Sequence, residues 1–180
     1  MYLYNIRAAL EQLEHIPDSG GSVLILLTSE ELKQGAGVSG LEHILCHTPS
    51  AQDARVCKAE SRYNCLCGTI VTPRHTKEHT PIAFGYLLTE GRVVLCDDTG
   101  TARSAIQHLR KETAQRELGI GGFFYGFLEL LIAKDLHHLQ GLEDRMNQME
   151  EQVLSGELEQ FNPQMTALRK EIFKWIRYYT

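Results

Sequence analysis

The sequence predicts an α/β (α+β) fold, with a central mixed sheet flanked by helices and followed by a long helical hairpin. Residues 22–27 form a continuous apolar run, which is typical of a strand buried on both faces. Two β-rich runs, 81–88 and 92–96, flank a short turn at Glu90-Gly91 and predict a β-hairpin. After Gly119, apolar residues instead recur at three- and four-residue intervals, which is the period of a helix.

A helix start is predicted directly after the first strand. Thr28-Ser29-Glu30-Glu31 has the S/T-x-x-E form of a capping box, in which the first and fourth side chains each bond the other's backbone N–H. We therefore expect a short helix over 29–34, ending at Gly35. A second short helix is expected over 41–47, inside a segment rich in Gly, Ser and Pro.

The middle of the chain carries the signals of four strands and one helix. The strands are expected at 55–60, 65–72, 81–88 and 92–96. Asp97-Asp98-Thr99-Gly100 should end the last of them. Residues 102–117 then predict an amphipathic helix, because Ile106 and Leu109 fall at helical spacing.

The last third of the chain predicts two helices. Gly156 suits the position after the end of the first, and Asn162-Pro163 suits an N-cap followed by Pro at the first helical position of the second. We divide the chain into an α/β domain at 1–119 and a helical arm at 120–180. The second helix shows no stop signal, so we expect the natural polypeptide to continue. Its apolar residues are Met165, Leu168, Ile172, Trp175, Ile176 and Tyr179.

Composition excludes several classes of protein. With 43% hydrophobic and 23% charged residues among 180, the chain is neither disordered nor of low complexity. Eighteen Lys and Arg against 23 Asp and Glu give a net charge of -5, which argues against a nucleic-acid binder. No secretory signal is visible, and the five Cys suit reduced thiols. The longest apolar run, 121–133, is shorter than the roughly 20 residues that span a membrane, so we expect residues 1–180 to be soluble.

The charges of the arm are distributed unevenly. Residues 134–160 contain seven acids and two bases, whereas residues 161–180 contain four bases and one acid. We expect two solvated helix faces that attract each other weakly, by about 0–1 kcal/mol for each exposed pair.

A glycine motif near the start of the chain matches the dinucleotide fingerprint G-x-G-x-x-G. It comprises Gly35-Ala36-Gly37-Val38-Ser39-Gly40, and Glu60 follows about 20 residues later. The fingerprint has to connect a strand directly to a helix N-terminus, where the pyrophosphate binds. Because the expected helix at 29–34 intervenes, we interpret the glycines as a surface loop.

Four side chains near the predicted third strand resemble a zinc set. Cys65 and Cys67 would lie on one strand face, and His75 and His79 have the spacing of a ligand pair. The C-x-C spacing is tighter than the usual C-x₂₋₄-C, and strand cysteines are commonly small buried apolar residues. Core thiols beside a solvated His loop are therefore the competing interpretation.

Two smaller clusters have plainer explanations. Cys46-His47 and Cys57 contain a thiol and a base, but no third group orients them, and we expect no enzymatic activity. Asp97-Asp98 would offer oxygen ligands to a hard cation, although a role in a turn and helix cap explains the pair equally well.

One further pattern extends over most of the chain. Its residues are Gly68-Thr69-Ile70-Val71-Thr72-Pro73, Phe84-Gly85-Tyr86-Leu87-Leu88-Thr89, Tyr125-Gly126-Phe127-Leu128-Glu129-Leu130-Leu131, Asp135-Leu136, Met149-Glu150-Glu151-Gln152-Val153-Leu154 and Leu168-Arg169-Lys170-Glu171-Ile172. This pattern resembles the CorA family of divalent-cation transporters.

The resemblance implies the cytoplasmic regulatory domain of a transporter that carries Mg²⁺ or Co²⁺ across the cell membrane as a pentamer. The family's pore helix and its Gly-Met-Asn signature would follow Thr180. In such a protein a regulatory Mg²⁺ binds between carboxylates of neighbouring subunits. Glu78 and Asp98 are the carboxylates of this chain that best match that role.

Two other functions remain open from the sequence. The apolar stripe over 165–179 would let a soluble scaffold or regulatory protein bind a partner helix. Alternatively, Cys65, Cys67, His75 and His79 would make the chain a zinc-binding protein.

Overall fold

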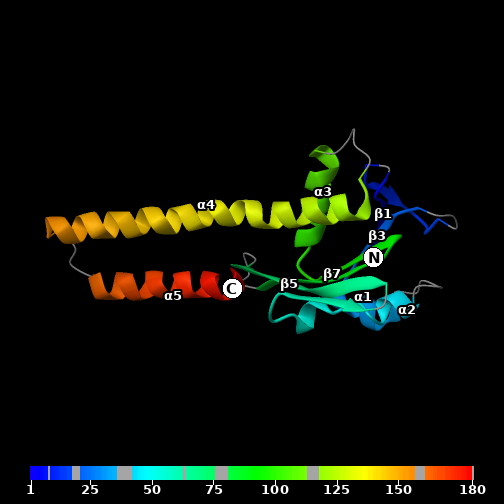
Figure 1. Ribbon diagram of the computed structural model, residues 1–180, viewed down its shortest axis with the longest axis horizontal. Coiled ribbons are helices and arrows are strands. Elements are labelled where there is room, and N and C mark those ends of the chain that lie inside the picture. Colours follow the sequence, from blue (N-terminus) through cyan, green and yellow to red (C-terminus); the bar gives the residue numbers. More distant parts are fainter. Residues whose placement is uncertain are drawn as a thin grey trace. The chain divides into compact units, whose positions relative to one another are not determined.

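The computed structural model describes residues 1–7, 9–17, 21–35, 42–62, 64–75, 81–112, 118–156 and 161–179. These residues form two compact units, Met1–Leu128 and Glu129–Thr180. The first contains a sheet with helices on both faces, and the second is a pair of helices (Figure 1). None of the described helices combines the length and hydropathy needed to cross a bilayer.

The described strands form one mixed sheet, as the sequence predicts. Its order is β2-β1-β3-β7-β6-β5-β4. Only β3 and β7 pair in parallel, and the other described neighbours are antiparallel. The strands are β1 (Tyr2–Asn5), β2 (Glu11–Leu13), β3 (Val23–Leu27), β4 (Lys58–Arg62), β5 (Cys65–His75), β6 (Pro81–Leu88) and β7 (Arg92–Asp97).

Several strand predictions are confirmed, and others need correction. All five residues of β3 are buried between β1 and β7, as its apolar run indicates. The strand expected at 55–60 instead covers Lys58–Arg62, since the chain leaves the 3₁₀ turn only at Ala54 and the Arg55 side chain donates to the carbonyls of Gln52 and Ala54. The sheet also contains β1 and β2, which the sequence analysis does not predict.

Three short helical segments lie between β3 and β4, and one longer helix, α3, follows the last strand of the first unit. They are α1 (Ser29–Lys33), α2 (Glu42–Leu45), the 3₁₀ turn η2 (Ala51–Asp53) and α3 (Thr101–Glu112). The predicted capping box is present: the Thr28 hydroxyl accepts from the Glu31 N–H, and the Glu31 carboxylate accepts from the Thr28 N–H. Residues 36–41 and 113–117 lie outside the described residues, so the glycine motif beyond Gly35 is not described.

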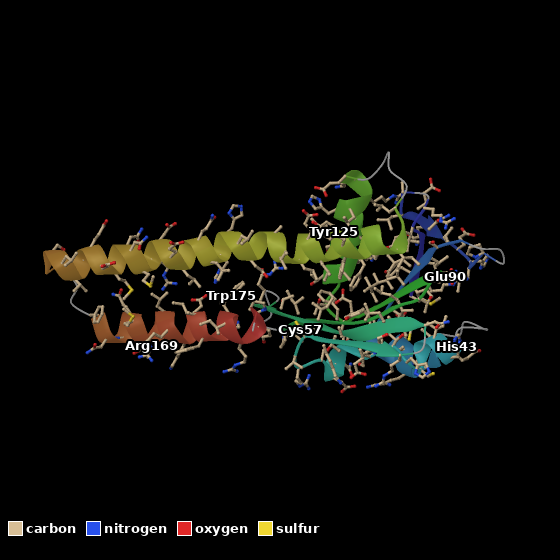
Figure 2. All side chains as sticks on the ribbon, in the orientation of Figure 1. His43, Cys57, Glu90, Tyr125, Arg169 and Trp175 are labelled. Carbon is tan, nitrogen blue, oxygen red and sulfur yellow. The ribbon has the colours of Figure 1, made fainter. Side chains whose placement is uncertain are left out.

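The second unit is built from the distal part of α4 (Ile120–Ser155) and from α5 (Phe161–Tyr179). Gly156 has a φ of 75°, which confirms its role after the end of α4. Because α5 already begins at Phe161, the prediction of Asn162 as its N-cap is wrong, and Pro163 lies within the first turn. Leu142 and Met149 of α4 pack on Leu168 and Trp175 of α5. Figure 2 labels Trp175 on α5.

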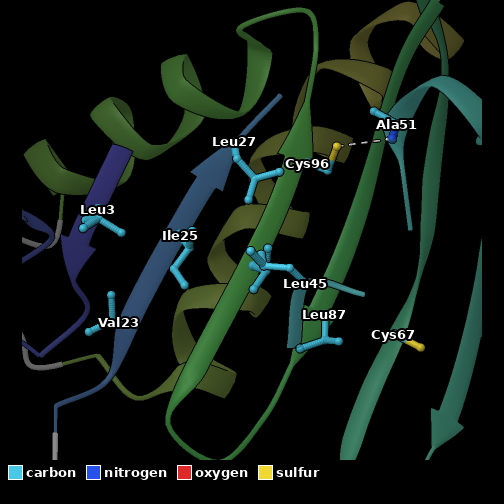
Figure 3. Packing of buried hydrophobic residues seen from close by; sticks show 10 residues of the cluster. Leu3, Val23, Ile25, Leu27, Leu45, Ala51, Cys67, Leu87 and Cys96 are labelled. Carbon is cyan, nitrogen blue, oxygen red and sulfur yellow. Dashed lines mark hydrogen bonds between the residues drawn. The ribbon is translucent and has the colours of Figure 1, made fainter. Parts of the chain in front are cut away.

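Two apolar layers hold the first unit together. On one face of the sheet, Leu45 and Ala51 of the connecting helices pack on strand residues such as Ile25 and Leu87 (Figure 3). On the other face, the Phe127 ring meets Phe84 edge-on at a centroid distance of 5.5 Å. The first turns of α4 therefore belong to the sheet unit, which extends to Leu128 beyond the helix start at Ile120.

Candidate functional site

The carboxyl ends of β3 and β7 lie side by side, because these strands are parallel neighbours. At this edge Asp98 accepts two hydrogen bonds from Ser29, the first residue of α1. The backbone N–H donates at 2.7 Å and the hydroxyl at 2.6 Å. A carboxylate at a helix N-terminus is stabilised by such N–H groups and by the helix dipole.

Ser29 is the centre of this strand-end cluster and is fully buried. Its hydroxyl accepts from the Ser50 hydroxyl at 2.9 Å and from the Gln52 N–H at 3.3 Å. It also lies 3.4 Å from the Cys96 sulfur. One hydroxyl thus joins α1, η2 and β7. The sequence analysis does not single out Ser29, whose only signal is its place next to the N-cap after a buried strand.

The hydrogen bonds of Asp97 confirm the turn and helix-cap role that the sequence predicts for the Asp pair. It accepts from the N–H and hydroxyl of Thr99 at 2.8 and 2.7 Å, and from the Ala102 N–H at 2.7 Å. The last bond stabilises the first turn of α3, and Asp97 is buried. The assignment of Asp98 as a cation ligand remains a prediction, beside its structural contact with Ser29.

The other proposed metal ligands are only partly described. Glu78 and His79 lie outside the described residues, while His75 ends β5. Among the residues that the structure describes, no group of three or more His, Cys, Asp and Glu is arranged to hold a metal ion. Cys67 is buried, which raises the pKa of its thiol, and the Cys65 thiol donates to the Arg62 carbonyl at 2.9 Å. Zinc binding by the predicted set therefore remains a prediction.

The two exposed thiols bond to the backbone. Cys46 donates to the His43 carbonyl at 3.1 Å, and Cys57 donates to the Val71 carbonyl at 3.4 Å. No base approaches either sulfur through these bonds. These bonds give both thiols a structural contact with the backbone.

A polar pocket of about 420 Å³ lies between the η2 segment and strands β4 and β5. Its charged rim includes Lys58, Glu60 and Arg62, and Glu60 forms ion pairs with both bases. Hydrogen bonds from Lys58 and then Arg62 lower the pKa of Glu60. The three charges largely satisfy one another on the exposed edge of the sheet.

The helical arm has a groove of about 350 Å³ on one of its faces. Leu139, Met146 and Ile176 line it and are each more than a third exposed. Trp175 forms part of the wall and is itself buried, with its ring stacked on His138 at 4.6 Å. The groove therefore presents apolar side chains of both helices to their surroundings.

Two ion pairs in the described part of the arm join an acid of α5 to bases of α4. Glu171 belongs to the basic helix α5, yet it lies 2.9 Å from the His138 ring nitrogen and 3.7 Å from the Arg145 guanidinium, both on the acidic helix α4. These two contacts have the opposite arrangement to the expected attraction of α4 acids to α5 bases, which remains a prediction for the other charged residues. Exposed acids such as Glu143 and Glu150 make no ion pair with the residues that the structure describes.

Comparison with known proteins gives matches by structure. No protein-family model and no curated protein matches the sequence. The structure of the full-length CmaX protein matches 98% of the chain with a TM-score of 0.71 at 12% identity. The ZntB cytoplasmic domain from Vibrio parahaemolyticus matches 99% with a TM-score of 0.69 at 12% identity. The CorA magnesium transporter from Methanocaldococcus jannaschii matches 97% with a TM-score of 0.66 at 18% identity.

The chain has the fold of a CorA-type cytoplasmic domain. The resemblance to the CorA family is thereby confirmed at the level of the fold. The chain spans 58% of the length of CmaX, 73% of the ZntB domain and 57% of the complete CorA transporter. The CorA-type fold includes both the sheet unit and the helical arm, because each match covers nearly all of the chain.

Proposed function

We propose that this chain is the cytoplasmic regulatory domain of a divalent-cation transporter. The observation that carries the proposal is the match of both structural units to transporter domains over 97–99% of the chain. The proposal includes no catalytic step. It assigns the chain a binding role, in which occupancy by a cation is communicated to membrane-spanning segments elsewhere in the polypeptide.

In this proposal the transporter carries Mg²⁺ or Co²⁺, and the regulatory ion that the domain senses is Mg²⁺. Carboxylates that face each other across a subunit seam repel, and a bridging divalent ion removes that repulsion. Such an ion would stabilise the closed assembly by about 2.7 kcal/mol at a hundredfold excess over its Kd. Glu78 and Asp98 are the proposed ligands, and the assembly is proposed to be a pentamer.

The membrane part of the proposal is tested by the reading frame that follows codon 180. We expect it to encode two apolar segments of about 20 residues, each long enough to span a bilayer. A stop codon at that point would contradict a transporter and would favour the scaffold function. The apolar groove on the arm is the observation that supports a scaffold as the second candidate.

The sensing part of the proposal needs a separate experiment. We expect millimolar Mg²⁺ to raise the melting temperature of the protein or to increase its oligomeric mass. Glu78→Gln and Asp98→Asn should each reduce that response, whereas Asp144→Asn on the arm should leave it unchanged. If Mg²⁺ alters neither property in the wild-type protein, the chain does not sense this ion in the proposed way.

A further inference from the structure

Helix α4 carries two parallel rows of apolar side chains beyond its contact with the sheet. One row, which includes Leu142 and Met149, is buried against α5. The second row repeats every seven residues, and its members are 38–48% exposed: Ile132, Leu139, Met146 and Val153. Single exposed apolar residues are common on protein surfaces, but a sustained seven-residue repeat is the pattern of a helix-pairing seam.

The exposed row continues across the groove onto α5. Leu139 and Met146 line one side of the groove, and Ile176 lines the other. Phe173, one turn before Ile176, is 53% exposed. The exposed apolar surface thus includes residues of both α4 and α5 on the groove side of the arm. Burial of such a surface against another molecule would contribute about 25 cal/mol for each Å² removed from water.

Charges of opposite sign lie on the two rims of this surface. Glu143 and Glu150 follow Leu139 and Met146 by four residues on α4, so they lie one turn further along the same side of the helix. Both are exposed and make no ion pair with any described residue. On α5 the exposed Arg169 guanidinium lies 5.8 Å from the centre of the Phe173 ring.

The antiparallel packing of α4 and α5 determines the height of these charges, that is, their position along the common axis of the two helices. Glu171 contacts both His138 and Arg145, so it lies level with the residues between them. Arg169 precedes Glu171 by two residues and is therefore level with a point two residues further along α4, close to Glu143, since α5 runs opposite to α4. Glu143 on the acidic rim and Arg169 on the basic rim thus lie at nearly the same height along the arm.

We propose that the groove face of the arm binds the same face of a second copy of this chain. In this pair a two-fold axis runs parallel to the helices, so α4 of each copy lies against α5 of the other. The rotation keeps every residue at its own height along the arm, so it places Arg169 of each copy next to Glu143 of the other, with Glu150 about two turns further along. The two exposed apolar rows then face each other between the charged seams.

A second copy fits this face better than an unrelated helix, because the face is complementary to itself. The face has an acidic rim on α4 and a basic rim on α5. Rotation by half a turn places the acidic rim of each copy against the basic rim of the other, along both lines (seams) where α4 meets α5. The inference uses only the faces of α4 and α5 and does not depend on cation transport. It adds a pairwise contact to whatever ring the full-length protein forms.

Charge reversal tests the pairing directly. The wild-type protein should dimerise with rising concentration in sedimentation equilibrium. Arg169→Glu places like charges in both seams, as does the double variant Glu143→Lys with Glu150→Lys, and each should raise the dimer Kd about tenfold or more. Mixed together, the two variant proteins should form a heterodimer with nearly wild-type affinity, because both of its seams again pair unlike charges.

Matched control variants distinguish the loss of these charge contacts from the effect of a changed net charge and from misfolding. Asp144→Lys with Glu151→Lys has the same charge change and the same spacing on another side of α4, and Arg177→Glu does the same on α5. These variants should dimerise like the wild type, and circular dichroism should show equal helix content in all proteins. A wild-type chain that stays monomeric at every concentration would overturn the proposal, as would variants whose mixture fails to recover pairing.

Discussion

The Asp98 carboxylate accepts both the backbone N–H and the hydroxyl of Ser29, at 2.7 and 2.6 Å, across 69 positions of sequence. The contact connects the end of β7 to the start of α1. We expect Asp98→Asn to lower the free energy of unfolding by about 1 kcal/mol, since the amide loses a charged acceptor on an exposed residue. Urea denaturation measures this. Asp97→Asn should cost more, because Asp97 is buried and caps α3; equal or reversed costs would contradict this assignment.

Gly85 is predicted to tolerate no side chain. A Cβ at this position would lie 1.7 Å from the carbonyl oxygen of Pro49, so the segment before η2 would have to move off the sheet. We expect Gly85→Ala to destabilise the protein by about 3 kcal/mol, the upper part of the usual range for overpacking. Gly91→Ala is the matched control, because a Cβ there meets nothing within 4 Å. Similar thermal stability of the two variants would show that the Pro49 contact is wrong.

The thiols should react in an order set by burial. Cys46 and Cys57 are exposed, whereas Cys67 and Cys96 are buried. Burial raises the pKa of the Cys67 and Cys96 thiols, which lowers their thiolate fraction as well as their accessibility. With a disulfide reagent such as DTNB at neutral pH, we expect Cys46 and Cys57 to react first. Cys96 should react only after unfolding, and mass spectrometry of partly labelled protein identifies each site. Early labelling of Cys96 would contradict the described core.

Leu168 should control the stability of the helical arm. It is 1% exposed and packs in the cluster with Leu142 and Trp175. Leu168→Ala is expected to cost about 2–5 kcal/mol through lost burial and the remaining cavity. Trp175 is the only tryptophan of the chain, so its fluorescence reports unfolding of this unit. Thr166→Ala, at an exposed position of the same helix, should leave the transition unchanged within about 0.5 kcal/mol.

Glu31 should make stability depend on acid pH. Burial opposes ionisation of its carboxyl, but bonds from the Met1 ammonium group and the Thr28 N–H outweigh that effect and lower its pKa below the ordinary 4.5. A carboxyl with a lowered pKa stabilises the fold above its unfolded pKa, and this contribution disappears as the pH falls through the folded value. The difference in unfolding free energy between wild type and Glu31→Gln should therefore shrink on acidification. Urea denaturation of both proteins at neutral and acid pH measures this difference, and a difference that stays constant with pH would contradict the role of Glu31.

Local patterns predicted much of the secondary structure. The bounds of β6 and the capping box at Thr28 agree with the sequence analysis, and α4 begins and ends within a residue or two of its expected limits. These features depend on periodicity and on contacts between near neighbours in sequence, which a single chain segment already contains. The three-residue strand β2 was missed, because it is too short and too polar to show an alternating pattern.

Only the tertiary structure decided which distant residues meet. The sequence indicated a capping or cation role for Asp98, but its partner Ser29 comes from another element and is brought close by the parallel pairing of β3 and β7. The groove between α4 and α5 likewise depends on the register in which two helices pack, as defined by Glu171. Periodicity determines which face of a helix is apolar, whereas the packing of the whole chain determines which part of that face stays exposed.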